Sequence, residues 1–389
     1  MPTSVSMLPW PLTAAQRELQ DAARAFAHEQ LAKLAEECDR NGTLPTALVD
    51  SFHASGLPNR FLSSAEGDDF VSSACLVAEE LSYGCAGLAS YLMLPVFFNR
   101  LVLAYLRGEE RAAFLRACMA APVVTSFAAS EARAGSDMLS LETDATRTPT
   151  GYRLNGRKEY SSNLRHADYV IVVARTGPAG VRASDALSWF LVPTDSPGVR
   201  VGERWPTFGL RAIDVSPLEL TEVEVPYSRL LGGEGRGLSM MAHSLAQSRT
   251  GIAALGVGIA RRARDLVMEH GKRRRLYGDK LNRMQDYRFR IADMEKTIAA
   301  ARALVWVAAR AADRGEDAGK ESSVAKLFAG ETVMQVTTAA SAMLGSVGYT
   351  GQSEIEKLLR DARHVAIVEG TEPTHKEIIF ANMLRHGAY

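Results

Sequence analysis

The stretch Leu218-Glu219-Leu220-Thr221-Glu222-Val223-Glu224-Val225 alternates apolar and polar side chains almost without a break. A period of two residues is typical of a half-buried strand, because successive side chains of a strand point to opposite faces of the sheet. A sheet with one apolar and one polar face is characteristic of antiparallel architecture. This stretch therefore predicts an antiparallel β domain in the middle of the chain.

Further strand patterns lie upstream of this stretch. Tyr169–Val173 and Leu187–Val192 consist of β-branched and aromatic residues, which are enriched in strands. Tyr152-Arg153-Leu154 leads into Asn155-Gly156, a pair that is favoured in tight hairpin turns. We predict a compact antiparallel β domain over residues 122–237, with a hairpin turn at Asn155-Gly156.

The pattern is helical on both sides of the β domain. Near the N-terminus, apolar residues recur every three to four positions after Thr13, a candidate helix cap. Near the C-terminus, one apolar face persists over five turns, a break follows at residues 314–317, and another helix is predicted near Ser322. We predict an α+β multi-domain chain with an N-terminal helical domain (1–121), the β domain (122–237) and a C-terminal four-helix bundle (238–389). The periodic positions are Leu19, Ala22, Ala23, Phe26 and Leu31 in the first segment and Ile291, Met294, Ile298, Ala301, Val305 and Ala308 in the second.

Composition argues against several classes of protein. The 389 residues contain 45 basic and 45 acidic side chains, whereas nucleic-acid binders usually carry a basic excess. The basic run Lys272–Arg275 is interpreted as a solvated helix end. Residues 1–11 lack the features of a secretory signal, and no segment approaches the roughly 18 uninterrupted apolar residues of a membrane helix. We predict a cytoplasmic protein that binds neither nucleic acid nor membranes.

The cysteines are predicted to be buried, reduced thiols. They show no CxxC spacing and no histidines at metal-site spacing, which argues against a disulfide framework or a structural zinc site. No metal site is predicted. The four residues are Cys38, Cys75, Cys85 and Cys118.

Several motifs, in register with one another, point to one family. Ser130–Asp137 and Tyr152–Asn163 resemble T-E-P-x-A-G-S-D and Y-x-x-N-G-x-K-x-W-I-T-N of the acyl-CoA dehydrogenases. Arg360–Thr371 resembles the R-D-A-R/K-x-x-x-I-Y-E-G-T pattern of the same family, and Arg274–Gly278 with Gln285 resembles its R-x-x-F-G and downstream Gln. Either principal motif alone is moderate evidence, but the joint match over nearly the whole chain is specific.

The resemblance implies FAD-dependent α,β-dehydrogenation of an acyl thioester. Glu369 would abstract the α-proton while flavin N5 accepts the β-hydride, and the Glu369 N–H would help to stabilise the enolate-like transition state. Burial by a bound acyl chain and by the apolar stretch Ala366–Val368 would raise the pKa of Glu369 and make it a better base. Pro373 and the possible capping box Thr374-x-x-Glu377 predict a helix that begins near Thr374. Glu369 is thus expected in a loop between two helices.

The resemblance also implies a flavin-ring site in the β domain. Ser130 corresponds to a family residue that bonds the pyrimidine edge, and Ser162 to one whose hydroxyl approaches N5. Tyr160 stands where an aromatic side chain packs against the isoalloxazine. These substitutions keep a hydroxyl or an aromatic face.

The remainder of the cofactor would be held by two subunits. Arg274 resembles an arginine that reaches the FAD pyrophosphate from a neighbouring subunit, a task suited to bidentate guanidinium contacts. Tyr277 and Gln285 accompany it, and Thr371 would contact the AMP side. The implied assembly is a homodimer or a homotetramer.

For the substrate, Ser136 corresponds to a position near the phosphopantetheine arm and also near the cofactor, while Arg249 and Gly370 lie close to the base in the pattern. His364 and His375 flank the base in sequence, but nothing pairs either of them with a nucleophile. They are interpreted as surface or capping residues.

The chain departs from the family pattern at several positions. Ala342 replaces a Gln that helps to hold FAD, which would weaken FAD binding unless other groups compensate, and Ala246 replaces an acid near the pantetheine. Ala132 and Arg133 replace the turn residues of the loop after Ser130. These changes leave open whether the carrier is coenzyme A or an acyl carrier protein. The remaining departures are Ser346 for a Gly and Val368 for a Tyr.

Other activities on the same fold stay open. The leading interpretation is a dehydrogenase that passes electrons to an electron-transfer flavoprotein or another acceptor. An acyl-CoA oxidase usually has a further C-terminal domain, whereas this chain ends twenty residues after Glu369. A monooxygenase does not need this Glu, and nitroalkane oxidase-like enzymes typically have Asp in its place. A helical scaffold that has lost its flavin is the non-enzymatic alternative.

Overall fold

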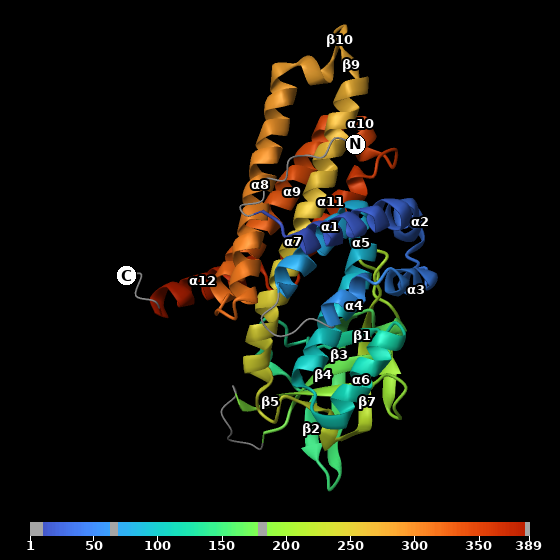
Figure 1. Cartoon of the computed structure of the whole chain (residues 1–389), viewed down its shortest axis with the longest axis vertical. Helices are drawn as coiled ribbons and strands as arrows, with labels where there is room; N and C mark the ends of the chain where they lie inside the picture. The colour runs from blue at the N-terminus through green and yellow to red at the C-terminus, as the bar shows by residue number, and fades with distance from the viewer. Residues whose placement is uncertain (1–10, 63–68, 178–184, 386–389) are drawn as a thin grey trace.

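The computed structural model describes residues 11–62, 69–177 and 185–385. The β domain occupies one end of the elongated molecule, and the long helices of the C-terminal part occupy the other (Figure 1). The N-terminal helices lie against the middle of the molecule, and the last helix, α12 (Glu372–Arg385), projects sideways from it. The prediction about a secretory signal at residues 1–11 falls almost entirely outside the described residues.

The N-terminal part is helical, as predicted, and the predicted Thr13 cap is confirmed. Thr13 Oγ1 accepts from Gln16 N at 3.1 Å, and Gln16 Oε1 accepts from Thr13 N at 3.2 Å, which forms a reciprocal capping box. The long helix α5 has a non-helical residue at Cys85, where two helical segments meet at a kink. The helices are α1 (Ala14–Phe26), followed by a π-helical turn (Ala27–Leu31), α2 (Ala32–Asn41), α3 (Ala47–Ala54), α4 (Leu57–Leu62), α5 (Phe70–Tyr105) and α6 (Gly108–Ala120).

The middle of the chain forms one eight-stranded sheet in the order β6-β7-β3-β2-β4-β5-β8, with β1 paired to β4. Most pairs are antiparallel, but β1 and β2 each run parallel to β4, so the sheet is mixed and the prediction of a purely antiparallel domain was wrong in this detail. The long loop between β1 and β2 allows both strands to run in the same direction. The strands are β1 (Thr125–Ala128), β2 (Asp144–Arg147), β3 (Gly151–Ser162), β4 (Tyr169–Arg175), β5 (Leu187–Pro193), β6 (Val199–Val201), β7 (Val215–Pro226) and β8 (Leu230–Leu231).

Asn155-Gly156 does not form the predicted hairpin turn. Strand β3 continues through it, and the pairing with β7 shifts register between Leu154 and Gly156. Asn155 Oδ1 accepts from Glu222 N at 2.8 Å, while Asn155 Nδ2 donates to Glu222 Oε1 at 2.7 Å. The side chain of Asn155 thus bridges a β-bulge in the neighbouring strand, where Glu222 has a φ of 53°.

The C-terminal part is the predicted helical bundle, in which α7, α8, α9 and α11 pack on one another. The predicted break is present after α8, and helix α9 begins at Gly319, three residues before the predicted start near Ser322. The elements are α7 (Gly237–Arg273), the short strands β9 (Arg275–Leu276) and β10 (Asp279–Lys280), α8 (Gln285–Asp313), α9 (Gly319–Leu344), α10 (Ser346–Tyr349), α11 (Ile355–Ile367) and α12.

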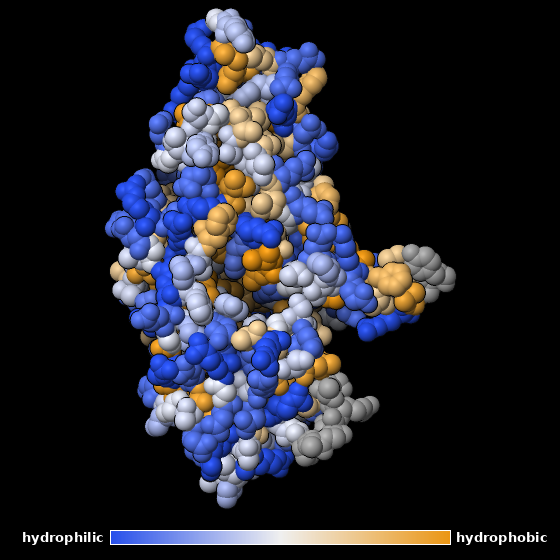
Figure 2. All heavy atoms as spheres, turned by 180° about the vertical axis from the view of Figure 1, so that it is seen from behind, coloured by the Kyte–Doolittle hydropathy of each residue, from blue (hydrophilic) through white to orange (hydrophobic). Residues whose placement is uncertain are grey.

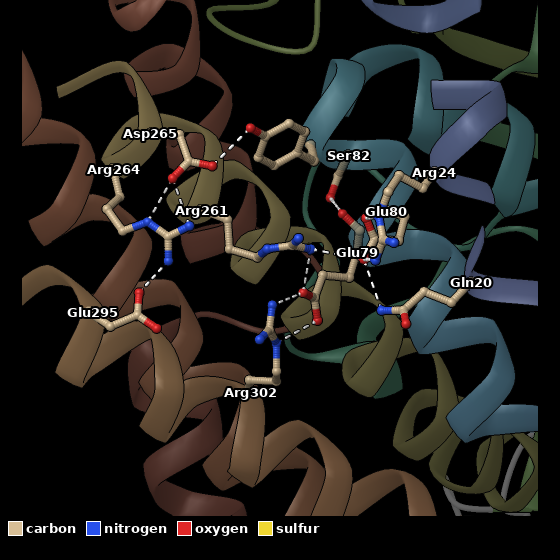
Figure 3. Close-up of polar contacts among 11 residues, drawn as sticks. Gln20, Arg24, Glu79, Glu80, Ser82, Arg261, Arg264, Asp265, Glu295 and Arg302 are labelled. Atoms are coloured by element: carbon tan, nitrogen blue, oxygen red, sulfur yellow. Dashed lines mark hydrogen bonds and ion pairs between the residues drawn. The ribbon is translucent and has the colours of Figure 1, made fainter. Parts of the chain in front are cut away.

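The N-terminal helices and the C-terminal bundle share one hydrophobic core, which runs from α1 through α5 and α7 to α11. A buried ion-pair cluster crosses the same boundary (Figure 3). Glu79 of α5 pairs with Arg261 of α7 at 2.6 Å and with Arg302 of α8. Burial alone would raise the pKa of Glu79, but Arg302 and Arg261 outweigh it and lower that pKa. The cluster therefore remains charged and ties three helices together.

Helix α5 is long and apolar enough to cross a membrane by length and composition alone. However, 78% of its most apolar window is buried inside the protein, as is usual for a core helix of a soluble protein. The four cysteines are free and buried, as predicted.

Candidate active site

Glu369 lies in the short loop between α11 and α12, as predicted. The new helix begins at Glu372, two residues before the expected start, so the capping box at Thr374 was wrong. Instead, Thr374 is already helical, and its hydroxyl lies 3.2 Å from that of Thr371. The loop is therefore only four residues long, which holds Glu369 close to both helix ends.

The backbone of this loop is unusual. Glu369 has a φ of 55°, in the left-handed region that a residue with a Cβ rarely adopts, and Gly370 has a φ of 123°. Arg249 of α7 donates from Nε to the Glu369 carbonyl at 3.0 Å, and Lys326 of α9 donates from Nζ to the Gly370 carbonyl at 2.7 Å. Strained backbone of this kind persists where the surroundings over-determine it, and it clusters at active sites.

The carboxyl group of Glu369 is partly buried. Its Oε2 atom finds no hydrogen-bond donor within the described parts of the chain. Burial raises the pKa of Glu369, and the Ser248 hydroxyl, Arg249 and Lys326 each act in the opposite direction. The net result is a carboxylate that is a stronger base than an exposed one, with one oxygen left free to accept a proton.

Two residues next to Glu369 were not predicted as part of the site. Lys326 is 1% exposed, and burial lowers its pKa to about 8. His375 is fully buried, with its Nε2 only 3.0 Å from where a Cβ on Gly370 would lie, so its interpretation as a surface or capping residue was wrong. Burial, together with Lys326 and Arg249, lowers the pKa of His375 to about 4.

A sequence signal for Lys326 did exist. Lys326 lies on the buried face of α9, where small and apolar side chains recur at helical spacing. A lysine on such a face is rare unless it has a partner. No comparable signal marks His375, because α12 shows no clear apolar face. The neighbours of Lys326 on that face are Ser322, Ala325, Ala329 and Val333.

The motif before the base anchors α11 to the rest of the molecule. Arg360 pairs with Asp39 of α2 at 2.5 Å, and Asp361 accepts from Leu210 N at 2.7 Å in the loop that precedes β7. Gly209 packs so closely on α11 that a Cβ there would lie 2.2 Å from the Arg360 carbonyl oxygen. These contacts fix α11, and with it the base, against both other parts of the chain.

The motif after β1 is held by a buried ion pair. Lys158 of β3 donates to Glu131 Oε1 at 2.7 Å and to the Ala129 carbonyl at 3.0 Å. Glu131 also accepts from Thr143, and its neighbour Ser130 accepts from Glu159 N through its carbonyl at 3.0 Å. Despite Ala132 and Arg133, the loop still turns, since Glu131 and Ala134 exchange backbone hydrogen bonds.

The predicted flavin-ring residues surround this loop. Ser130 and Ser162 are partly buried, and Ser162 ends β3, whereas Ser136 is exposed. Tyr160 is 63% exposed and Trp205 is 40% exposed, and their ring centroids lie 6.3 Å apart. Sequence analysis missed Trp205, which has no strand or motif pattern around it. The two ring planes lie 44° apart, so each ring is a separate exposed aromatic side chain against which part of a planar ring could pack.

Arg274, Tyr277 and Gln285 lie at the opposite end of the bundle. They belong to the turn between α7 and α8, where all three are exposed and Tyr277 is 94% exposed. Arg274 follows Arg249 by 25 residues of continuous helix, or roughly 37 Å along its axis. These three residues therefore lie far from Glu369 of the same chain. Thr371, in contrast, lies in the same loop as Glu369 and is exposed.

The face opposite to that of Figure 1 is hollowed at mid-height, where apolar side chains gather between the helical part and the β domain (Figure 2). No cluster of His, Cys, Asp and Glu suited to a metal occurs within the described residues.

The chain is similar to known proteins over nearly its whole length. The acyl-CoA dehydrogenase N-terminal, middle and C-terminal domains match residues 13–121, 126–223 and 235–384. Cyclohex-1-ene-1-carbonyl-CoA dehydrogenase of Geobacter metallireducens is 33% identical, over 92% of this chain and 95% of its own. Probable acyl-CoA dehydrogenase YngJ of Bacillus subtilis is 31% identical, over 96% and 99%. The structure of butyryl-CoA dehydrogenase from Megasphaera elsdenii superposes with a TM-score of 0.92 at 28% identity, over 97% of this chain and 100% of that one.

The chain therefore belongs to the acyl-CoA dehydrogenase family, whose members are flavoprotein oxidoreductases that act on CH–CH bonds.

Proposed function

We propose that this enzyme catalyses FAD-dependent α,β-dehydrogenation of an acyl thioester, with Glu369 as the base. The observation that carries the proposal is the Glu369 carboxyl group, which has a raised pKa and a free Oε2 atom on a strained loop. A general base works best when its pKa approaches the operating pH, and burial moves Glu369 in that direction.

The residues present fit a flavin. Tyr160 and Trp205 are two exposed aromatic side chains, and Ser130, in the loop after β1, and Ser162, at the end of β3, each carry a hydroxyl group. When bound, FAD would supply the acceptor for the β-hydride. The protein's own part is to orient the thioester and to accept the α-proton on Glu369, while Arg249 and Lys326 hold the loop.

The position of Arg274 supports a flavin site that is completed by a second copy of the chain. Because Arg274 lies roughly 37 Å along α7 from Arg249, it would serve the flavin of a partner subunit. Exposed aromatic side chains at Tyr277 and Phe289, and the projecting α12 with exposed Phe380, are the kind of surface that assembly buries. We propose a cytoplasmic homodimer or homotetramer.

The carrier and the electron acceptor are proposed at the level of chemical class. The substrate is an acyl group on coenzyme A or on an acyl carrier protein, both of which present the same phosphopantetheine thioester. Electrons would pass to an electron-transfer flavoprotein or a similar acceptor.

An anaerobic titration of the purified flavoprotein with acyl-CoAs and acyl-carrier thioesters tests the proposal. Bleaching of the flavin band by one thioester, with formation of the α,β-unsaturated product, is the expected result. A yellow protein that no thioester bleaches would favour a monooxygenase-type relative, and rapid reoxidation by oxygen after bleaching would favour an oxidase. A colourless protein that cannot take up FAD would leave the scaffold alternative.

A further inference from the structure

We propose that Lys326 is a positioning residue for the base: through the Gly370 carbonyl it holds the 369–370 backbone in the conformation that presents the Glu369 carboxylate. This inference rests on the proposed role of Glu369 and extends it to a side chain on a different helix.

The geometry of the loop supports this role. Arg249 and Lys326 approach from different helices and bind consecutive carbonyl groups, those of Glu369 and Gly370. Two consecutive peptide planes are fixed in this way, which sets both backbone angles of Gly370 and the orientation of the peptide group that follows Glu369. Since Glu369 has a positive φ, which a residue with a Cβ rarely adopts, its backbone would relax toward ordinary angles without these donors.

The burial of Lys326 argues that its contact is more than incidental. A lysine that is 1% exposed loses nearly all of its hydration, and a hydrogen bond to one carbonyl replaces little of it. Lys326 is therefore retained at an energetic cost in the middle of a helix face where an apolar residue would pack. Glu369 is the carboxylate that offsets this cost, because it favours the charged form of Lys326.

His375 completes the arrangement from the other side. Its ring packs under Gly370, and neither ring nitrogen has a hydrogen-bond partner among the described residues. Because its pKa is lowered to about 4, the ring is neutral near pH 7 and adds no positive charge next to Lys326. The titratable groups that face the loop from the packed elements are Arg249 of α7, Lys326 of α9, His364 of α11 and His375 of α12.

The test compares Lys326→Met, Lys326→Arg and the control Lys376→Met in the FAD-loaded enzyme. Lys376 is an exposed lysine of α12 that pairs with Glu372 and does not contact the loop carbonyls. We expect kcat to fall ten- to hundredfold in Lys326→Met with at most a threefold change in KM, since a displaced base slows proton transfer more than it weakens binding. Lys326→Arg should recover most of kcat, and the control should keep it.

A second readout separates positioning from a merely structural role. Lys326 lowers the pKa of Glu369, so its removal should move the acidic limb of the kcat–pH profile to higher pH. The control should leave that limb in place. If Lys326→Met does not yield folded flavoprotein, Lys326→Gln, which keeps a donor without the charge, takes its place.

The inference is overturned if Lys326→Met keeps kcat within twofold and leaves the acidic limb unchanged. Where Lys326→Gln takes its place, the donor is kept and the charge is lost, so an acidic limb that does not move overturns the inference. It is equally overturned if kcat and thermal stability fall together while the limb stays in place. A parallel Glu369→Gln variant separates the role of Lys326 from that of Glu369. Retained turnover in Glu369→Gln would rule out Glu369 as the base, whatever the result for Lys326.

Discussion

Glu369 combines two unfavourable features in one residue. Its left-handed backbone costs on the order of 1–3 kcal/mol, and its Oε2 atom is buried without a donor in the described chain. Neither feature contributes to folding, which is what we expect if Glu369 is kept for the proposed proton abstraction. The neighbouring Arg249 and Lys326 offset part of the cost by binding the loop carbonyls.

His375 makes a prediction about stability and pH. In the folded protein its pKa is lowered to about 4, below the ordinary value near 6.5 that the unfolded chain would show. Between these values the unfolded state binds the proton and the folded state does not, so folding stability falls as pH falls through this window. His375→Gln should remove roughly 2 kcal/mol of this loss, seen as a smaller drop in melting temperature between pH 7 and pH 4.5.

His364 supplies the comparison for that measurement. Its pKa is also lowered to about 4 by burial, so His364→Gln should likewise reduce the loss of folding stability that occurs when the pH is lowered. Only the change with pH matters, because either substitution can alter packing at all pH values. Equal pH dependence in the wild type and in His375→Gln would contradict the account of His375 as a buried neutral ring.

At the residue level, the sequence predicted that Glu369 is the base, which stays a prediction, but it did not predict the residues that surround Glu369. Glu369 and Arg249 were identified because they lie in motifs, and the structure brings them together. Lys326 and His375 reach the loop from other helices, and such proximity depends on how helices pack. Ser130, Ser162 and Tyr160 occur around one loop of the β domain, but their contacts with flavin stay a prediction.

Among the elements, α11 is held in place by contacts with two other parts of the chain. The loop that contains Glu369 follows its C-terminal end, and the helix docks on α2 through Arg360 and on the loop before β7 through Asp361. The tight contact at Gly209 leaves no room for a side chain. A displacement of this helix would therefore shift the base relative to the β domain.

Gly209→Ala tests this docking. The added Cβ would lie 2.2 Å from the Arg360 carbonyl oxygen, a backbone atom that cannot move without moving α11. We expect a loss of about 1–3 kcal/mol in unfolding free energy and a lower kcat, measured by denaturant unfolding and steady-state kinetics. Gly351→Ala is the control, because a Cβ at Gly351 meets nothing within 4 Å. Equal stability and activity in both variants would argue against a rigid α11 contact.

Elements with a clear period were predicted well. The alternation of Leu218–Val225 corresponds to β7, and the helical faces correspond to α1 and α8. The prediction of a hairpin turn at Asn155-Gly156 was wrong because β3 continues through this dipeptide, and Asn155 bonds across to the bulge at Glu222 of β7, a partner strand distant in sequence. The parallel pairing of β1 and β2 with β4 likewise depends on contacts distant in sequence.

At the scale of the whole molecule, the bundle places two groups of candidate cofactor-binding residues far apart. The flavin-ring candidates belong to the β domain, whereas Arg274 lies at the far end of α7. A single chain cannot bring these groups to one FAD molecule, so the proposed site requires a second copy. The assembly is thus part of the catalytic argument.

Arg274→Ala tests the shared site. We expect the ratio of FAD to protein after gel filtration to fall at least several-fold, because a bidentate phosphate contact is lost, while the dissociation constant of the acyl thioester changes little in FAD-reconstituted enzyme. Arg273→Ala is a matched control from the same exposed run, where Arg273 lies within reach of Glu269 in its own helix. Weaker thioester binding with unchanged FAD retention would contradict the pyrophosphate role.

The proposed removal of the α-proton by Glu369 is tested most directly by an anaerobic stopped-flow comparison of the wild-type enzyme with Glu369→Gln. The substitution changes little volume and leaves the Arg249 and Lys326 contacts, which involve the backbone. We predict that Glu369→Gln keeps its FAD content. We also predict that the preferred acyl thioester reduces its flavin roughly 10²–10⁴-fold more slowly than in the wild type. Reduction at close to the wild-type rate would show that another group is the base.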